Sequence, residues 1–250
     1  MTTTDAPSIR LRAEGLSRRF GGLLAVSALN LEIRDREILG LIGPNGAGKS
    51  TTFNLLSGFL APSSGRLWIG GREVTGGSPE AISRQGLVRT FQHGSLMRTM
   101  TVEDNILIGA IGGMRGANRH ARTQRVRETA ELVGLQHVLG ETAGNLPHGL
   151  QRLVSIAIAF APRPRLLCLD EPLTGLNQTE VAAVLATFRA IRDRFDTSIL
   201  LVEHNMKAVM RTCDRLYVLH HGQLLATGTP TEVRANPQVL AAYLGNVNVD

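Results

Sequence analysis

Three short runs of the chain are apolar at every position, a pattern typical of strands buried on both faces. The runs are ILGLI at 38–42, LLCL at 166–169 and ILLV at 199–202. Such strands usually belong to a parallel sheet that other layers cover on both sides. We therefore predict an α/β protein whose core is built around these three strands.

Two other segments alternate between apolar and polar residues. Apolar side chains fall two positions apart at Ile9, Leu11 and Ala13, and again at Leu29, Leu31 and Ile33. Because successive side chains of a strand point to opposite faces, each group is expected to share one face of a half-exposed strand. RLWIG at 66–70 is expected to join them in an antiparallel sheet.

Helical spacing marks further segments, where apolar residues recur three or four positions apart. The longest stripe lies between 181 and 191, and shorter stripes lie at 126–133 and 206–213. Residues 93–160 show helical patterns and no strong buried strand. This middle part is therefore predicted to be a helical lobe inserted into the α/β core.

Composition places the chain among globular proteins but leaves the role of its charge open. No apolar run approaches the roughly 20 residues that span a bilayer, and the N-terminus lacks the apolar core of a secretory signal, so we expect a cytoplasmic protein. The net charge is +6. A cluster of arginines could face nucleic acid, anionic lipid or solvent. No aromatic residues lie between these arginines, which weakens a nucleic-acid site based on base stacking. The cluster consists of Arg115, Arg119, Arg122, Arg125 and Arg127.

The two cysteines and the paired histidines predict no zinc site. Cys168 lies inside an apolar run and is expected to be a small core residue, and the spacing to Cys213 fits no metal-ligand pattern. His220 and His221 precede Gly222, and this stretch is predicted to be a turn.

The first chemical motif is GPNGAGKS, from Gly43 to Ser50, which satisfies G-x-x-x-x-G-K-[ST]. It follows the run at 38–42 and precedes a helix-compatible segment, the context that a phosphate-binding loop requires. Glycines let backbone N–H groups point inward, where they and the following helix N-terminus hold phosphate oxygens. Lys49 adds a charge at the β- and γ-phosphates, Ser50 can ligate Mg²⁺, and Thr51 can reach the α-phosphate. The predicted nucleotide-binding residues here are Gly43, Asn45, Gly46, Ala47, Gly48, Lys49, Ser50 and Thr51.

An acidic pair ends the second apolar run, at Asp170 and Glu171. In open α/β sheets, ligands bind at the carboxyl ends of the strands. Asp170 is placed to hold Mg²⁺ through a water molecule, and Glu171 to act as the general base that polarises an attacking water. Together with the phosphate loop, the pair predicts ATP and Mg²⁺ as ligands.

These motifs, in this order, give the chain a family resemblance. It resembles the ATP-binding subunits of ABC transporters over nearly its whole length. The resemblance implies one P-loop NTPase domain over 8–250, with an antiparallel β subdomain and an inserted helical subdomain. The ATPase core with the β subdomain would cover 8–92 and 161–250, and the helical subdomain with the signature loop would cover 93–160.

Four residues outside the two motifs receive roles through this resemblance. Phe20 matches the aromatic residue that stacks on adenine, and Val26 the small apolar residue that touches the base or ribose. Gln92 matches the glutamine that links Mg²⁺ and the attacking water to the helical subdomain. His204 matches the switch histidine that contacts the γ-phosphate. Catalytic roles are thus expected for Glu171, His204, Gln92 and Lys49, and metal ligation for Ser50, Gln92 and Asp170.

The signature loop departs from the family pattern L-S-G-G-Q. In NLPHGLQ at 145–151, Leu146 and Gly149 match, but Pro147 replaces the serine and His148 the first glycine. The resemblance implies that two subunits pack head to tail, with each signature contacting the partner's ATP. Proline offers neither a hydroxyl nor an N–H group, although it suits the first position of a helix. We therefore expect a heterodimer with one reduced ATP site, and a homodimer stays the alternative.

Several sequence segments are similar to those of one subgroup, the ATP-binding subunits of branched-chain amino-acid importers. They include FNLLSGFLAPSSG, LVEHNMKAVM and the C-terminal GTPTEVRANPQVLAAYLG. The resemblance implies two membrane permease subunits, a second ATP-binding subunit and, indirectly, an extracytoplasmic solute-binding protein, with this chain at the cytoplasmic face of the membrane. No nucleic-acid partner is expected. The alternatives are a soluble ABC ATPase acting on nucleic acid or ribosomes, an exporter ATPase, and a regulatory subunit that binds ATP without turnover.

Overall fold

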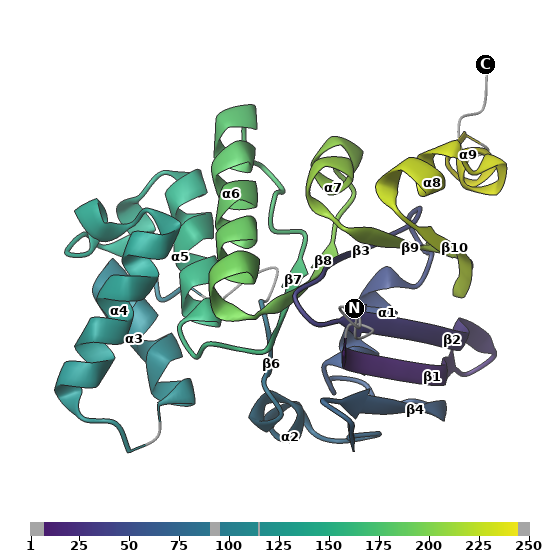
Figure 1. Cartoon of the computed structure of the whole chain (residues 1–250), viewed down its shortest axis with the longest axis horizontal. Helices are drawn as coiled ribbons and strands as arrows, with labels where there is room; N and C mark the ends of the chain where they lie inside the picture. The colour runs from purple at the N-terminus through teal and green to yellow at the C-terminus, as the bar shows by residue number, and fades with distance from the viewer. Residues whose placement is uncertain (1–7, 91–95, 115, 245–250) are drawn as a thin grey trace, which may run out of the picture.

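The computed structural model describes residues 8–90, 96–114 and 116–244 (Figure 1). Its strands are β1 Ile9–Phe20, β2 Leu23–Arg34, β3 Ile38–Ile42, β4 Ser64–Ile69, β5 Arg72–Glu73, β6 Leu87–Arg89, β7 Leu166–Asp170, β8 Ser198–Val202, β9 Arg215–His220 and β10 Gln223–Gly228. Its α-helices are α1 Lys49–Leu56, α2 Pro79–Arg84, α3 Val102–Gly113, α4 Arg119–Val133, α5 His148–Phe160, α6 Gln178–Phe195, α7 Met206–Thr212, α8 Pro230–Ala235 and α9 Pro237–Leu244. Two short 3₁₀ helices lie at Gln136–Val138 and Ala143–Asn145.

A six-stranded sheet forms the centre of the molecule, in the order β10-β9-β3-β8-β7-β6. All neighbouring pairs are parallel except β9 with β10. The three apolar runs are β3, β8 and β7, which lie side by side, and each is buried along its full length. In β3, Ile38 and Ile42 enter one core cluster and Leu39 and Leu41 the other, so the prediction of strands buried on both faces is confirmed.

A second, four-stranded antiparallel sheet has the order β2-β1-β4-β5 and covers one side of this core (Figure 1). Its inward residues follow the predicted alternation with one exception. A register shift between Ile9 and Leu11 turns Ile9 outward, so its predicted place on the buried face is wrong. Arg10 is buried instead, and its guanidinium pairs with Asp35 at 2.8 Å and Asp196 at 3.2 Å.

Helices cover the other side, and α3, α4 and α5 gather at the end of the molecule far from the antiparallel sheet (Figure 1). The predicted stripe of α6 is confirmed, since Val184, Leu185, Phe188 and Ile191 are buried. The α4 stripe is buried as well, while the cluster arginines of 119–127 lie on the same helix. Cys168 is a buried core residue, as expected.

Glycines allow α3 to approach α5 closely. A Cβ atom at Gly109 would lie 2.2 Å from the carbonyl oxygen of Ile158, and one at Gly113 would lie 2.5 Å from that of Pro162. Backbone therefore touches backbone where α3 crosses α5 and the residues that follow it. This close crossing fixes the position of α5, whose first residues carry the predicted signature loop.

Candidate nucleotide-binding site

The phosphate loop connects β3 to α1, and its glycines are needed for close packing as well as for conformation. Gly43 has φ 152° and Gly48 has φ 98°. A Cβ atom at Gly43 would lie 2.2 Å from the Leu219 carbonyl oxygen, and one at Gly48 would lie 2.7 Å from that of Ala25. The loop is thus pressed between β9 and β2, where only glycine fits at these positions.

Helix α1 begins without a side-chain cap. Gly48 is the N-cap residue, and the first turn holds no acidic side chain. The first N–H groups and the positive end of the helix dipole are therefore left for an anion. The Lys49 ammonium donates to the carbonyl oxygens of Gly43 at 2.7 Å and Pro44 at 3.0 Å, which holds it across the loop. Burial lowers the pKa of Lys49, and the carboxylates of Glu171 and Asp170 oppose that shift.

A cavity of about 500 Å³ opens over this loop. Most of the predicted nucleotide contacts line it, namely Phe20, Asn45, Gly46, Ala47, Gly48, Lys49, Ser50, Thr51 and Glu171. Phe20 ends β1 and is 42% exposed, with the Arg18 guanidinium over its ring at 4.7 Å. An exposed ring at the rim of a phosphate-binding cavity is suited to stacking on a base.

Val26 does not line this cavity. Its side chain is fully buried in the core beneath the antiparallel sheet, and the neighbouring Ala25 lines the cavity in its place. Gly43, the first residue of the loop, is also buried and does not line the cavity. The predicted base or ribose contact therefore does not fall to the Val26 side chain, because the alternation of β2 turns that side chain inward.

Sequence reasoning missed the β9–β10 turn as part of this site. His221 and Gly222 form the predicted turn, with φ 47° and 77°, and both line the cavity. The Gly222 N–H donates to the Ala47 carbonyl oxygen at 3.0 Å, and its own carbonyl accepts from Ser27 at 2.8 Å. The turn thus links the phosphate loop to β2 through hydrogen bonds. These contacts join segments far apart in the chain, so no local sequence pattern reveals them.

The acidic pair lies at the carboxyl end of β7, as predicted. Asp170 is 7% exposed, and burial together with Glu171 raises its pKa, while Arg89 and Lys49 oppose the shift. Glu171 has φ 47°, an unfavourable angle for a residue with a Cβ, and its N–H donates to the Val202 carbonyl oxygen at 2.9 Å. This bond ties the pair to β8.

His204 comes to the same edge of the sheet from the loop after β8. Its Nδ1 lies 3.9 Å from a carboxylate oxygen of Glu171. The His204 side chain is exposed, whereas its backbone is fixed by Glu203. Lys49, Asp170, Glu171 and His204 therefore surround one region, while Gln92 lies outside the described residues.

The oxygen ligands that Mg²⁺ prefers are present in this region. Ser50 presents an exposed hydroxyl at the start of α1, and Asp170 supplies a carboxylate at the carboxyl end of β7. A hydroxyl and carboxylates beside a phosphate-binding loop are the donor set of a Mg²⁺–nucleotide site. The residues present thus fit that ion.

The predicted signature loop lies apart from this cavity, at the start of α5. Pro147, which was expected to suit the first helical position, is instead the N-cap residue, and His148 begins the helix. A Cβ at Gly149 would lie 2.3 Å from the Glu180 carboxylate, which itself accepts from the Asn177 backbone in a capping box. The signature loop is therefore packed against the start of α6.

Comparisons with known proteins agree with this geometry. Residues 26–174 match the ABC transporter family, and residues 223–247 match the branched-chain amino acid ATP-binding cassette transporter family. The chain is 44% identical to the high-affinity branched-chain amino acid transport ATP-binding protein LivG of Salmonella typhimurium, over 94% of this chain and 97% of the relative. It is 39% identical, with the same coverage, to BraF of Pseudomonas aeruginosa, which has the same description.

Solved structures give the same result for the fold. An ATP-binding cassette of an ABC transporter in its ADP conformation aligns with a TM-score of 0.85 and 28% identity, over 95% of this chain and 99% of that one. A nucleotide-free cassette aligns with a TM-score of 0.85 and 27% identity, over 95% and 100%. The chain belongs to the ABC transporter family of ATP-binding proteins, and its fold is that of a P-loop ABC ATPase.

Proposed function

We propose that this chain is the ATP-binding and ATP-hydrolysing subunit of an ABC importer for branched-chain amino acids or related small solutes. The observation that carries the proposal is the grouping of four charged or titratable residues at one edge of the sheet. Lys49 and Glu171 line the cavity, the charge of Asp170 acts on Lys49, and His204 lies 3.9 Å from Glu171. The transport of branched-chain amino acids by the relatives LivG and BraF, and the C-terminal match at 223–247, support the solute class.

Each residue of the site has a role that follows from its position. The N–H groups of the loop and Lys49 bind and orient the phosphates, and Phe20 stacks on the base. Glu171 orients the attacking water and accepts its proton, while His204 contacts the γ-phosphate. Ser50, Asp170 and Gln92 would hold Mg²⁺, which supplies charge neutralisation on the transferred phosphoryl group when it is bound.

A dimer completes the site, because Leu146, Pro147, His148 and Gly149 do not line this chain's own cavity. In the proposed head-to-tail pair, these four residues face the ATP of the partner, which is a second ATP-binding subunit. Pro147 caps α5 without a hydroxyl, so the partner's ATP receives fewer donors. Pro147→Ser is expected to raise ATPase activity at that one site of the purified complex, and an unchanged rate would show that the proline is neutral.

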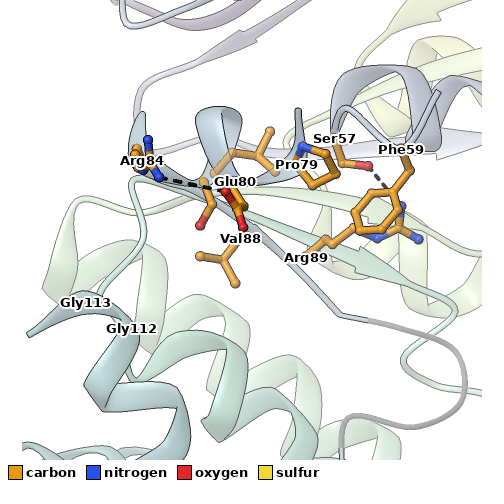
Figure 2. Close-up of a pocket in the computed structure, with 11 residues that line it drawn as sticks. Ser57, Phe59, Pro79, Glu80, Arg84, Val88, Arg89, Gly112 and Gly113 are labelled. Atoms are coloured by element: carbon orange, nitrogen blue, oxygen red, sulfur yellow. Dashed lines mark hydrogen bonds and ion pairs between the residues drawn. The ribbon is translucent and has the colours of Figure 1, made fainter. Parts of the chain in front are cut away.

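The proposed domain organisation assigns 8–92 and 161–250 to the ATPase core with its β subdomain and 93–160 to the helical subdomain. A groove of about 730 Å³ lies where the two parts meet (Figure 2). Figure 2 shows Phe59, Pro79 and Arg89 on the core side of this groove and Gly112 and Gly113 on α3. We assign the groove to a cytoplasmic helix of a permease subunit.

The proposed location is the cytoplasmic face of the bacterial inner membrane, held there by two permease subunits. Within residues 8–90, 96–114 and 116–244, no helix has the length and apolarity to cross a bilayer. Nucleotide-driven closure and opening of the dimer would be passed through the helical subdomain to the permeases. The solute-binding protein then contributes only indirectly, from the other side of the membrane.

The direct test is ATP hydrolysis by Glu171→Gln. Removing a general base is expected to lower kcat by about 10²–10⁴-fold while ATP binding persists. Glu131→Gln, an exposed carboxylate on α4, is the matched control and is expected to leave kcat unchanged. Equal rates for Glu171→Gln and the wild type would contradict the role of Glu171, and absence of turnover in the wild-type complex would support a regulatory subunit instead.

A further inference from the structure

Glu203 is a buried carboxylate to which neither the motifs nor the family comparison assigns a role. It lies between β8 and His204 and is 1% exposed. A carboxylate in such a position is costly unless its charge is compensated by hydrogen bonds. Burial raises the pKa of Glu203, and hydrogen bonds from the backbone N–H groups around it oppose that shift.

The two carboxylate oxygens of Glu203 accept hydrogen bonds from the backbones of two different loops. One oxygen accepts from the N–H of Leu173 at 2.8 Å. The other accepts from the N–H groups of His204 at 3.2 Å and Asn205 at 3.4 Å. A single side chain thus joins the turn after β7 to the loop after β8.

These two loops carry the two polar groups that face each other at the edge of the sheet. Leu173 lies two residues after Glu171, and the intervening turn closes with a bond from the Thr174 N–H to the Glu171 carbonyl oxygen at 3.4 Å. Glu203 therefore holds the backbone next to both Glu171 and His204, whose side chains are 3.9 Å apart. The His204 side chain is exposed, so the backbone anchor is what limits its position.

A third element reaches the same cluster from the helical side. Arg152 lies on α5, three residues after Gly149, and its guanidinium is 3.5 Å from the Thr174 carbonyl oxygen. Burial lowers the pKa of Arg152, and the charge of Glu203 opposes that shift. The helix that follows the signature loop is thus electrostatically linked to the buried carboxylate.

We propose that Glu203 is a positioning residue for ATP hydrolysis, which sets the distance between Glu171 and His204 by anchoring both of their loops at once. The proposal rests on the function proposed above. An amide cannot replace the carboxylate, because its NH₂ group would face backbone donors on one of the two sides. One loop would then lose its anchor although the shape of the side chain is kept.

The test compares Glu203→Gln with Glu37→Gln in the full-length chain. Glu37 is also buried and accepts from the Arg34 N–H and the Arg215 guanidinium, each at 2.7 Å, but it precedes β3 at the opposite end of the sheet. Under single-turnover conditions, Glu203→Gln is expected to lower the hydrolysis rate by about tenfold or more while the affinity for an ADP analogue stays constant. Glu37→Gln is expected to lower Tm and keep the rate.

A double-mutant cycle separates positioning from general destabilisation. Because Glu203 positions Glu171 and His204 relative to each other, the rate losses of Glu203→Gln and His204→Ala are expected to combine to less than their product, whereas independent effects would multiply. Glu203→Asp keeps the charge but is one methylene shorter, so it is expected to lose rate in the same way even where the glutamine variant folds poorly. Multiplying effects, or equal rate losses in Glu203→Gln and Glu37→Gln, would overturn the proposal.

A readout independent of turnover keeps this test distinct from that of the function itself. Amide hydrogen exchange at Leu173 and His204 is expected to accelerate in Glu203→Gln and to stay unchanged in Glu37→Gln. Unchanged exchange at both amides would contradict the anchoring, whatever the hydrolysis rate. Absence of hydrolysis in the wild type, with accelerated exchange in the variant, would instead count against the proposed function.

Discussion

The β9–β10 turn gives the sharpest single test of how the phosphate loop is held. In Gly222→Ala, the new Cβ would lie 2.7 Å from the Ala25 carbonyl oxygen, and the residue would keep φ 77°. The positive φ costs about 1–2 kcal/mol for an L-residue. Losing the bonds from Gly222 to Ala47 and from Ser27 to Gly222 adds about 1 kcal/mol each. The free energy of unfolding is therefore expected to fall by about 3–4 kcal/mol.

Gly71→Ala is a matched control for this substitution. Gly71 occupies the second position of the two-residue β4–β5 turn with φ 78°, and a Cβ atom added there would meet nothing within 4 Å. Only the cost of the positive φ, about 1–2 kcal/mol, should appear there. Urea unfolding measures the two losses, and titration with a fluorescent ADP analogue measures the site. Gly222→Ala is expected to weaken ADP binding by about tenfold and Gly71→Ala to leave it unchanged. Equal ADP affinities and equal losses of stability for both variants would refute the role of the β9–β10 turn in holding the phosphate loop.

Helix packing and the burial of charge give two further predictions. Gly109→Ala places a Cβ 2.2 Å from the Ile158 carbonyl oxygen and is expected to cost about 1–3 kcal/mol in a thermal melt, whereas Gly112→Ala on the same helix has open space and is expected to be neutral or slightly stabilising. Because burial and Glu171 raise the pKa of Asp170, the folded state binds its proton more tightly than the unfolded state, so this carboxyl lowers stability as pH rises above 3.8. Asp170→Asn is therefore expected to raise Tm at pH 7 in the absence of nucleotide while hydrolysis is lost, and a lower Tm would contradict the burial argument.

The parts of the fold that sequence predicted are those set by local periodicity. Strands β3, β7 and β8 each contain a continuous apolar run because both of their faces are buried, and the α6 stripe has helical spacing for one buried face. Ile9 was misplaced because a register shift reverses the alternation at the start of β1. No pattern of apolar and polar residues encodes such a shift.

In the candidate site, too, the residues that sequence predicted are those in local motifs, and the residues that it missed act through distant contacts. The phosphate loop and the acidic pair were found because their residues are contiguous and follow buried strands. Gly222 and Glu203 were missed because each acts through backbone contacts to segments far away in the chain. Val26 was assigned a contact with the base or ribose by resemblance, but its side chain is buried in the core of this protein. The role of Gln92 stays a prediction from the sequence.

The central claim, that this chain powers a membrane importer, is tested most directly by its partners. The chain would be purified from native membranes in mild detergent through an affinity tag, and the co-purifying proteins identified by mass spectrometry. The account predicts two membrane permease subunits and a second ATP-binding subunit in fixed proportion to the chain. Recovery with ribosomes or nucleic acid, or without any membrane protein, would contradict it.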